Sequence, residues 1–391
     1  MKRSIFIPAT FVAVGVLALT RLHPARADDA ADLKALIHKF YETYAQKNLN
    51  EHLALWSTEA KDLTTYRNTA QQLLDANDNL QVKQVTILKQ NIQRDRARLQ
   101  VYSDITATTK SGAPSPDFGK RVTNFECVKQ DKVWKVVRVS DAKRDLVEAL
   151  LTAPERRERQ RLLEQDRAIV APDIVNTLNQ LAEATARDGK LDEALHKNDV
   201  AREVAAFLGG RPADAPPTQV KFGATREEGY CWMYRGLIYA ISDKDKEAHE
   251  NYQRALTIFR EAKDAEGEAL TLNNLGTLQH RQGNVEEAAK SLEASLKLAR
   301  ASGNKAVEAF TLSNLGAVRE QLKDLPGALS AFEGSAKAYR EAGSKFGEAR
   351  ALVSVGNTQR KLKKLPEALA AYQASLTLRR ELQDRVGEAD V

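Results

Sequence analysis

The side chains that most often carry out chemistry are scattered along this sequence. The six histidines stand at positions 23, 38, 52, 196, 249 and 280, without a Cys/His or Ser/His/Asp set in their local context. The patterns GxSxG, HExxH, GxGxxG and the phosphate-binding GxxxxGK do not occur. A triad assembled from distant residues stays open, because folding brings such residues together. We nevertheless expect no enzyme, no cofactor and no metal site.

Aromatic side chains are the best candidates for lining a binding pocket. The candidates lie in the first third of the chain: Tyr41, Tyr44, Trp56, Tyr66 and Tyr102. A tyrosine that faces a pocket can hold or move a proton, whereas an aromatic stripe also serves simply as core. Asp104 shares a face with Tyr102 and is expected to be exposed. Which of these side chains point inward stays open.

The elements around these aromatic residues are helices followed by strands. Apolar residues at helical spacing predict helices over residues 33–44, 49–56 and 61–80. Alternating patterns then predict strands over residues 82–87, 97–109, 122–128 and 133–139. The dipeptide Asp131-Lys132 is expected to form the hairpin turn between the last two strands. Helices first and an antiparallel sheet afterwards predict an α+β domain over residues 28–145.

This segment resembles the nuclear transport factor 2-like (SnoaL-like) family. The resemblance rests on Phe40-Tyr41 with Tyr44 and Asn48, on Trp56, and on Val133-Trp134-Lys135-Val136. It implies a cone, in which a sheet curls around a long helix and leaves a pocket. Family members include enzymes, small-molecule binders and structural modules. Small-molecule binding in the cone is therefore an alternative function.

The second half of the chain repeats itself every 40 residues. Glycines recur at positions 236, 276, 316 and 356, and an alanine and then a bulky residue follow each of them at fixed distances. A more diverged copy contains Ala182 and Ala194. Each unit holds two apolar helical stretches, and a single pair of helices cannot bury both its faces. The sequence predicts about five stacked hairpins over residues 173–391, and the start of a sixth.

This spacing of small and bulky residues resembles the tetratricopeptide repeat (TPR) family, whose usual unit is about 34 residues. The additional residues here fall between repeats, as in residues 300–305. Long units of this type resemble those that precede caspase-related (CHAT) peptidase domains in bacterial proteins. A further unit opens at Gly387-Glu388-Ala389, and no polar cap follows. The alternative is therefore that the chain is the regulatory, substrate-recognition part of a longer peptidase.

The TPR resemblance implies a concave groove lined by the first helix of each hairpin. The groove residues would be Asn273, Asn274, His280, Arg281, Asn314, Glu320, Arg350, Asn357, Arg360 and Lys361. Asparagine amides can bond a peptide backbone without reading its sequence, and basic side chains suit carboxylates. We expect a protein or an extended, acidic peptide as partner. For each residue alone, a solvated helix face is the alternative.

The charge of the chain gives little reason to expect nucleic acid as a partner. The formal net charge is +6, and residues 1–27 contain four basic residues and no acidic one. Nucleic-acid binders normally present a clustered basic face, because phosphate neutralisation drives their affinity. Hydrophobic residues make up 42% and charged residues 29%, which is typical of a globular chain. We therefore expect no nucleic-acid binding.

The N-terminus predicts a secretory signal peptide. Lys2-Arg3 precedes an apolar core from Ile5 to Thr20, and Ala25-Arg26-Ala27 supplies a small-x-small cleavage site. An uncleaved anchor is the alternative, but the core is shorter than the roughly 20 residues that span a bilayer. We expect cleavage after Ala27, no membrane span afterwards, and a periplasmic or secreted protein.

The expected order is a signal peptide (1–27), a nuclear transport factor 2-like domain (28–145), a charged helical connector (146–172) and a TPR array (173–391). The mixed charges of the connector predict one rigid helix with a solvated face. A surface loop is expected from Gly209 to Phe222, because glycines and prolines gather there. Cys127 and Cys231 fall in different domains and are expected to be buried free thiols. The fold class is mostly α: a cone-like α+β domain followed by an α-solenoid. The predicted function is that of an exported, non-catalytic scaffold for protein–protein interaction.

Overall fold

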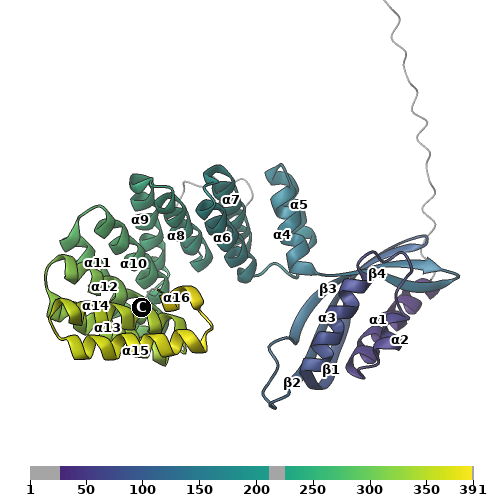
Figure 1. Ribbon diagram of the computed structural model, residues 1–391. Coiled ribbons are helices and arrows are strands. Elements are labelled where there is room, and N and C mark those ends of the chain that lie inside the picture. Colours follow the sequence, from purple (N-terminus) through teal and green to yellow (C-terminus); the bar gives the residue numbers. More distant parts are fainter. Residues whose placement is uncertain (1–26, 211–224, 390–391) are drawn as a thin grey trace, which may run out of the picture. The chain divides into compact units, whose positions relative to one another are not determined.

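The structure, a computed structural model, describes residues 27–210 and 225–389. It divides into two compact units, Met1–Asp145 and Leu146–Val391, which we call unit 1 and unit 2 (Figure 1). The predicted signal peptide and nearly all of the predicted loop after Gly209 lie outside the described residues. Within the described ranges, no helix combines the length and the apolar character needed to cross a membrane.

Unit 1 begins with three helices: α1 (Ala27–Ala45), α2 (Leu49–Leu53) and α3 (Leu63–Ala76). Apolar residues three and four apart give α1 one buried stripe, which includes Leu33, Ile37 and Phe40. Asn48 begins α2, because its side-chain oxygen accepts the backbone N–H of Glu51 at 3.2 Å. The predicted order of helices before strands is confirmed.

Four antiparallel strands follow and pair in sequence order: β1 (Asn77–Gln93), β2 (Arg96–Thr109), β3 (Gly119–Gln130) and β4 (Val133–Asp141). Asp131 and Lys132 both have positive φ, 50° and 67°, so they form the predicted two-residue hairpin turn between β3 and β4. β1 is much longer than the predicted strand over residues 82–87. Its last five residues are mostly polar, but their backbone still pairs with β2 from Lys89 to Gln93.

The core of unit 1 lies between α1 and one face of the sheet. Phe40 meets Phe125 of β3 edge to face, with ring centroids 5.0 Å apart. On β2, Leu99, Val101 and Ile105 point into this core. At the start of α1, Asp29 accepts the indole N–H of Trp134 at 3.3 Å.

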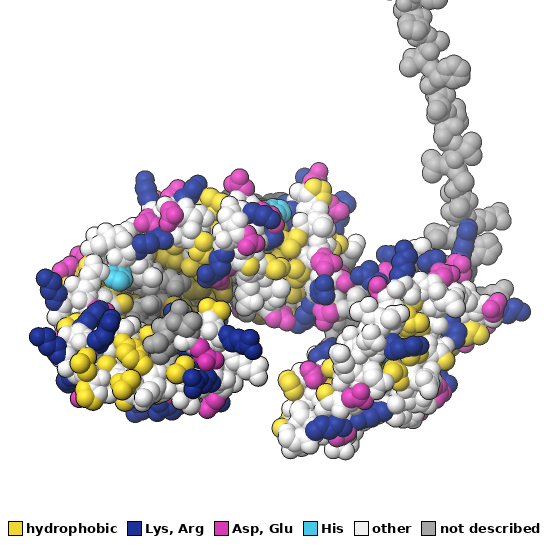
Figure 2. Space-filling model, in the orientation of Figure 1, with side chains coloured by type: hydrophobic (Ala, Val, Ile, Leu, Met, Phe, Trp, Pro, Cys, Tyr) yellow, Lys and Arg dark blue, Asp and Glu magenta, His cyan; other side chains and the backbone are white. Residues whose placement is uncertain are grey.

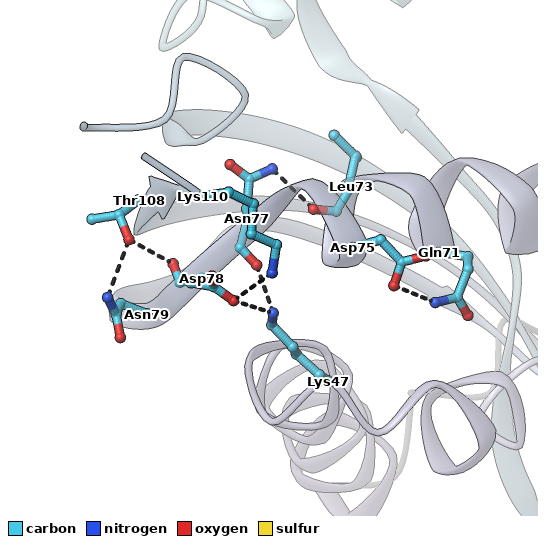
Figure 3. A network of polar contacts seen from close by, with 9 residues as sticks. All are labelled: Lys47, Gln71, Leu73, Asp75, Asn77, Asp78, Asn79, Thr108 and Lys110. Carbon is cyan, nitrogen blue, oxygen red and sulfur yellow. Dashed lines mark hydrogen bonds and ion pairs between the residues drawn. The ribbon is translucent and has the colours of Figure 1, made fainter. Parts of the chain in front are cut away.

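A polar network ties together the ends of α1, α3 and β1 (Figure 3). The Lys47 ammonium donates to the backbone oxygen of Asn77 at 2.6 Å and to the Asp78 carboxylate at 2.9 Å. Lys110, which follows β2, donates to the same carboxylate at 2.8 Å. Hydrogen bonds from Lys110 and Lys47 lower the pKa of Asp78. The buried Asn77 amide donates to the backbone oxygen of Leu73 at 2.9 Å, and so fixes the turn from helix to strand.

The predicted connector over residues 146–172 is not one solvated helix. It contains most of α4 (Ala142–Thr152) and all of α5 (Arg156–Gln165), which are separated near Pro154 because proline disfavours a helical residue before it. Arg159 is buried, contrary to the expectation of a solvated charged face. Its guanidinium makes a bidentate pair with Glu203 at 2.7 and 2.9 Å. This pair joins α5 to α7 of the repeat array.

Most of unit 2 is a row of helical hairpins, which lie side by side along a curve in Figure 1. The pairs are α6 (Pro172–Arg187) with α7 (Leu191–Leu208), α8 (Arg226–Ile241) with α9 (Asp245–Glu261), α10 (Ala265–Arg281) with α11 (Val285–Ser302), α12 (Lys305–Gln321) with α13 (Leu325–Glu341), and α14 (Lys345–Lys361) with α15 (Leu365–Glu381). The short helix α16 (Arg385–Ala389) follows. The predicted α-solenoid is confirmed.

The recurring glycines stand where the two helices of a hairpin touch. A Cβ atom on Gly316 would lie 2.6 Å from the ring of Phe332, and one on Gly276 would lie 2.8 Å from Leu292. Real Cβ atoms do not approach other atoms so closely, so only glycine fits. The small residue of each repeat thus stands where two helices approach, against the bulky residue of the same hairpin.

Polar contacts within hairpins and between neighbouring hairpins recur with the same period. A buried serine on a second helix donates to a backbone oxygen of the preceding first helix: Ser295 to Ala269 at 2.7 Å, Ser335 to Ala309 at 2.8 Å and Ser375 to Ala349 at 2.8 Å. An arginine near the end of each second helix from α9 to α15 pairs with a glutamate of the helix that follows: Arg260–Glu268 (2.7 Å), Arg300–Glu308 (2.9 Å), Arg340–Glu348 (2.8 Å) and Arg380–Glu388 (3.4 Å). The repeat thus fixes both packing within a hairpin and register between hairpins.

Candidate functional site

The first helices of four successive hairpins, α8, α10, α12 and α14, form a surface that we call the first-helix wall. Side chains connect neighbouring helices along it. The Asn314 amide of α12 donates to Asn273 Oδ1 of α10 at 3.0 Å and to Thr277 Oγ1 at 3.2 Å. Further along, the Thr358 hydroxyl of α14 donates to Glu320 of α12 at 2.6 Å. These bonds hold the helices of the wall in register.

One predicted groove residue is not on the surface. Asn273 has an exposed fraction of 0%, so it cannot contact a ligand, and the prediction that it lines the groove is wrong. A polar side chain can be buried here because Asn314 supplies a hydrogen bond to it. Asn273 supports Asn314, which remains half-buried at the wall.

Four other predicted groove residues make internal contacts. Lys361 donates to Glu320 at 2.7 Å, so these two charges neutralise each other. Arg281 donates to the backbone oxygen of Ala240 at 2.7 Å and pairs with Asp245. Asn357 accepts the hydroxyl of Tyr372 at 2.8 Å. These contacts orient the side chains but leave them fewer free hydrogen-bonding groups and less unpaired charge for a partner.

The remaining predicted residues are those most open to a ligand. Arg350 and Arg360 are exposed, and Asn274 and His280 are half-buried. Within the described ranges, none of these four side chains has a hydrogen-bond or ion-pair partner. Both arginines belong to α14, so uncompensated positive charge gathers at that end of the wall.

Sequence reasoning missed an apolar component of the wall. Tyr230 on α8 and Leu270 on α10 are partly buried, and Phe310 on α12 is 44% exposed. These residues and Arg350 are separated by 40 positions each, so they occupy one position of successive repeats. Figure 2 shows hydrophobic side chains on the hollowed side of unit 2. The repeat spacing that identified Arg350 could have identified Leu270 and Phe310 as well.

Unit 1 contains a separate cavity of about 140 Å³. Tyr41, Tyr44 and Tyr66 of the predicted cone pocket line it. Trp56 and Tyr102 do not, which corrects the prediction for both. Trp56 is buried behind Tyr66, with ring centroids 4.4 Å apart. Tyr102 points to the opposite face of β2, because side chains alternate along a strand and its neighbours Val101 and Ser103 point inward.

A buried histidine stands behind this cavity. His52 lies with Nδ1 3.0 Å from the backbone oxygen of Phe40 and Nε2 2.7 Å from the hydroxyl of Tyr66. A carbonyl oxygen only accepts, so Nδ1 carries the proton and Nε2 accepts from Tyr66. Burial lowers the pKa of His52 to about 4 and raises that of Tyr66 well above its usual value. At neutral pH both groups are therefore uncharged.

The cysteines offer no reactive group. Cys127 and Cys231 are free and buried, as predicted. Burial raises the pKa of each thiol to about 12, so neither forms a thiolate at neutral pH. Among the described residues, no cluster of histidine, cysteine and carboxylate side chains is arranged to hold a metal ion.

Comparison with known proteins agrees with the architecture of unit 2. Residues 230–301 and 307–381 match the family model of the tetratricopeptide repeat. The chain is 17% identical to BtubC (BKLC) from P. vanneervenii, over 62% of this chain and 93% of that one, with a TM-score of 0.49. RapI in its apo form is 16% identical over 54% and 72%, with a TM-score of 0.44. PilF of Pseudomonas aeruginosa is 19% identical over 55% and 87%, with a TM-score of 0.38.

No curated protein is significantly similar to this sequence. The family match covers the hairpins from α8 to α15, the same hairpins whose first helices form the wall. Their close glycine contacts and paired helices agree with that match. These hairpins of unit 2 are tetratricopeptide repeats.

Proposed function

We propose that unit 2 is a non-catalytic scaffold, and that its first-helix wall binds an extended segment of another protein. The observation that carries this proposal is the composition of the wall. Apolar side chains reach its surface on α8, α10 and α12, and unpaired arginines reach it on α14. A segment with apolar residues followed by acidic residues would complement both parts.

A peptide selection tests this proposal. The full chain would be used to enrich binders from a display library of random peptides. We expect the enriched sequences to combine apolar and acidic residues, and Arg350→Glu with Arg360→Glu to weaken their binding at least tenfold. Lys361 is left unchanged, because its pair with Glu320 would turn a reversal there into internal repulsion.

Lys337 supplies the matched control. It lies on α13, a second helix, and so it is off the wall, and its pair with Glu341 one turn away is long (4.0 Å) and solvent-exposed, so that reversing its charge costs little. Lys337→Glu should leave binding unchanged. Two outcomes would contradict the assignment of the binding surface to the first-helix wall. One is that the enriched peptides lack acidic residues, and the other is that Lys337→Glu weakens peptide binding as much as the two arginine variants do.

We also propose that the protein is exported after cleavage behind Ala27. The sequence of the first 27 residues carries this proposal, and the position of the first buried contacts supports it. Asp29 pairs with Lys129 and accepts from Trp134, so a cut after Ala27 leaves these contacts of unit 1 intact. Mass spectrometry of the protein from the periplasm or medium should find Asp28 as the first residue. An intact N-terminus would contradict it.

A further inference from the structure

The cavity in unit 1 has the size of a single ring. Its volume of about 140 Å³ is close to that of the engineered cavity of about 150 Å³ that binds benzene in another protein. It lies within unit 1, so any ligand there would bind independently of the first-helix wall.

The walls of the cavity are largely aromatic and aliphatic. Phe40 of α1, Tyr66 of α3 and Phe118 before β3 contribute rings, and Ile105 and Val139 contribute aliphatic side chains. Aromatic rings pack well against another ring, edge to face or offset. The body of a fitting ligand is therefore one apolar ring.

Two sets of polar groups line the cavity: Asp117 and Arg121 lie near Tyr44, and Ser103 and Thr123 lie near Tyr41. The first set carries the charges. Arg121 donates to the backbone oxygen of Asp117, and the Asn77 amide donates to the Asp117 carboxylate at 3.3 Å. Asn77 is itself fixed by the network in Figure 3. One positive and one negative charge therefore stand together, so this part of the lining has no net charge.

Tyr44 differs from the other two tyrosines of the cavity. The hydroxyl of Tyr66 is bound to His52, and that of Tyr41 is bound to Ser103 and Thr123. Within the described residues, the hydroxyl of Tyr44 has no such partner. Burial raises its pKa to about 12, so it is a neutral group that can donate one hydrogen bond and accept another.

We propose that this cavity binds an uncharged molecule with one six-membered ring and one hydroxyl or amide group. The ring lies among Phe40, Tyr66 and Phe118, and the polar group bonds the hydroxyl of Tyr44. A charged ligand is disfavoured, because it would lose its hydration without a net opposite charge to replace it.

Titration of the full chain with simple probes tests the proposal. Benzyl alcohol and benzamide are the neutral probes, and benzoate and benzylammonium are their charged counterparts. Calorimetry and saturation-transfer NMR should detect the neutral probes, with affinities at least tenfold higher than those of the charged ones. Tyr44→Phe keeps the ring but removes the hydrogen bond, and it should weaken benzyl alcohol about three- to tenfold.

Two cavity-filling variants locate the site. Val139→Phe and Leu73→Phe insert bulk from β4 and from α3, and each should abolish binding of benzyl alcohol while the circular dichroism spectrum is retained. Tyr102→Phe, on the opposite face of the sheet, is the control and should bind normally. The proposal is overturned if benzyl alcohol does not bind, if a folded cavity-filling variant binds it unchanged, or if a charged probe binds equally well.

Discussion

Unit 2 makes the same contacts several times, whereas unit 1 makes each of its contacts once. Gly276 and Gly316 meet equivalent bulky residues, and Ser295 and Ser335 make equivalent hydrogen bonds. In unit 1, the buried His52 has no counterpart among the other described residues. Repetition indicates residues that build the scaffold. Departures from it, such as the change from Leu270 and Phe310 to Arg350 at one repeat position, indicate where specificity resides.

The largest expected effect is the response of unit 1 to acid. His52 has a pKa of about 4 in the folded protein, against about 6.5 when unfolded. The unfolded state therefore binds the proton first as the pH falls, and unit 1 loses stability between about pH 6.5 and pH 4. The full loss is about 3 kcal/mol, and above pH 6.5 the stabilisation is fully present.

Urea unfolding of the full chain at several pH values measures this loss. In a Trp232→Phe background, the remaining tryptophans, Trp56 and Trp134, both report on unit 1. His52→Gln should flatten the dependence of the unfolding free energy on pH, and the exposed His38→Gln should not. A slope that is the same in both variants would show that His52 is not the group responsible.

The next effect concerns close packing in unit 2. Gly316→Ala places a Cβ atom 2.6 Å from Phe332, and overpacking of this kind should cost about 2 kcal/mol. Gly334→Ala is the matched control, because its Cβ would lie 3.2 Å from the flexible end of Leu312. Since alanine favours helix by about 1 kcal/mol over glycine, the control should be neutral or slightly stabilising. Thermal unfolding followed by circular dichroism compares the stability of the two variants. Equal changes in stability would argue against the close contact between Gly316 and Phe332.

The smallest effect is the loss of one repeated hydrogen bond. Ser335→Ala removes the donor to the backbone oxygen of Ala309 and should cost about 1 kcal/mol. Ser330, on the exposed side of the same helix, provides a control that should change stability by less than about 0.5 kcal/mol. Ala255 occupies the equivalent position two repeats earlier, so the array already tolerates the absence of one such bond. Denaturant unfolding that finds no difference between the two serine variants would contradict the assigned role.

The fold could be predicted from the sequence where residues repeat, because each copy is independent evidence for the same contact. Prediction was weaker where a single local feature decided the outcome. The last five residues of β1 are mostly polar, and their strand conformation depends on backbone pairing with β2. The charge run around Arg159 resembled a solvated face, yet one arginine is buried through its pairing with the distant Glu203.

The candidate sites could be predicted only in part, for a related reason. A position number within a repeat identifies the helix face, but not the depth of the side chain. Asn273 is buried where Asn314 donates to its side-chain oxygen, and Lys361 is neutralised by Glu320 from the neighbouring repeat. In unit 1, strand alternation places Tyr102 outside the cavity, and that assignment required the register of β2.

The affinity of the full chain for a selected peptide tests the assignment of the first-helix wall most directly. Phe310 and Leu322 lie on the same repeat and have nearly equal exposed fractions, 44% and 42%. Phe310 belongs to the wall, whereas Leu322 stands at the turn after α12. Phe310→Asp should weaken binding at least tenfold, and Leu322→Asp should leave the dissociation constant unchanged. Equal affinities of the two variants would contradict a partner that docks along the first helices.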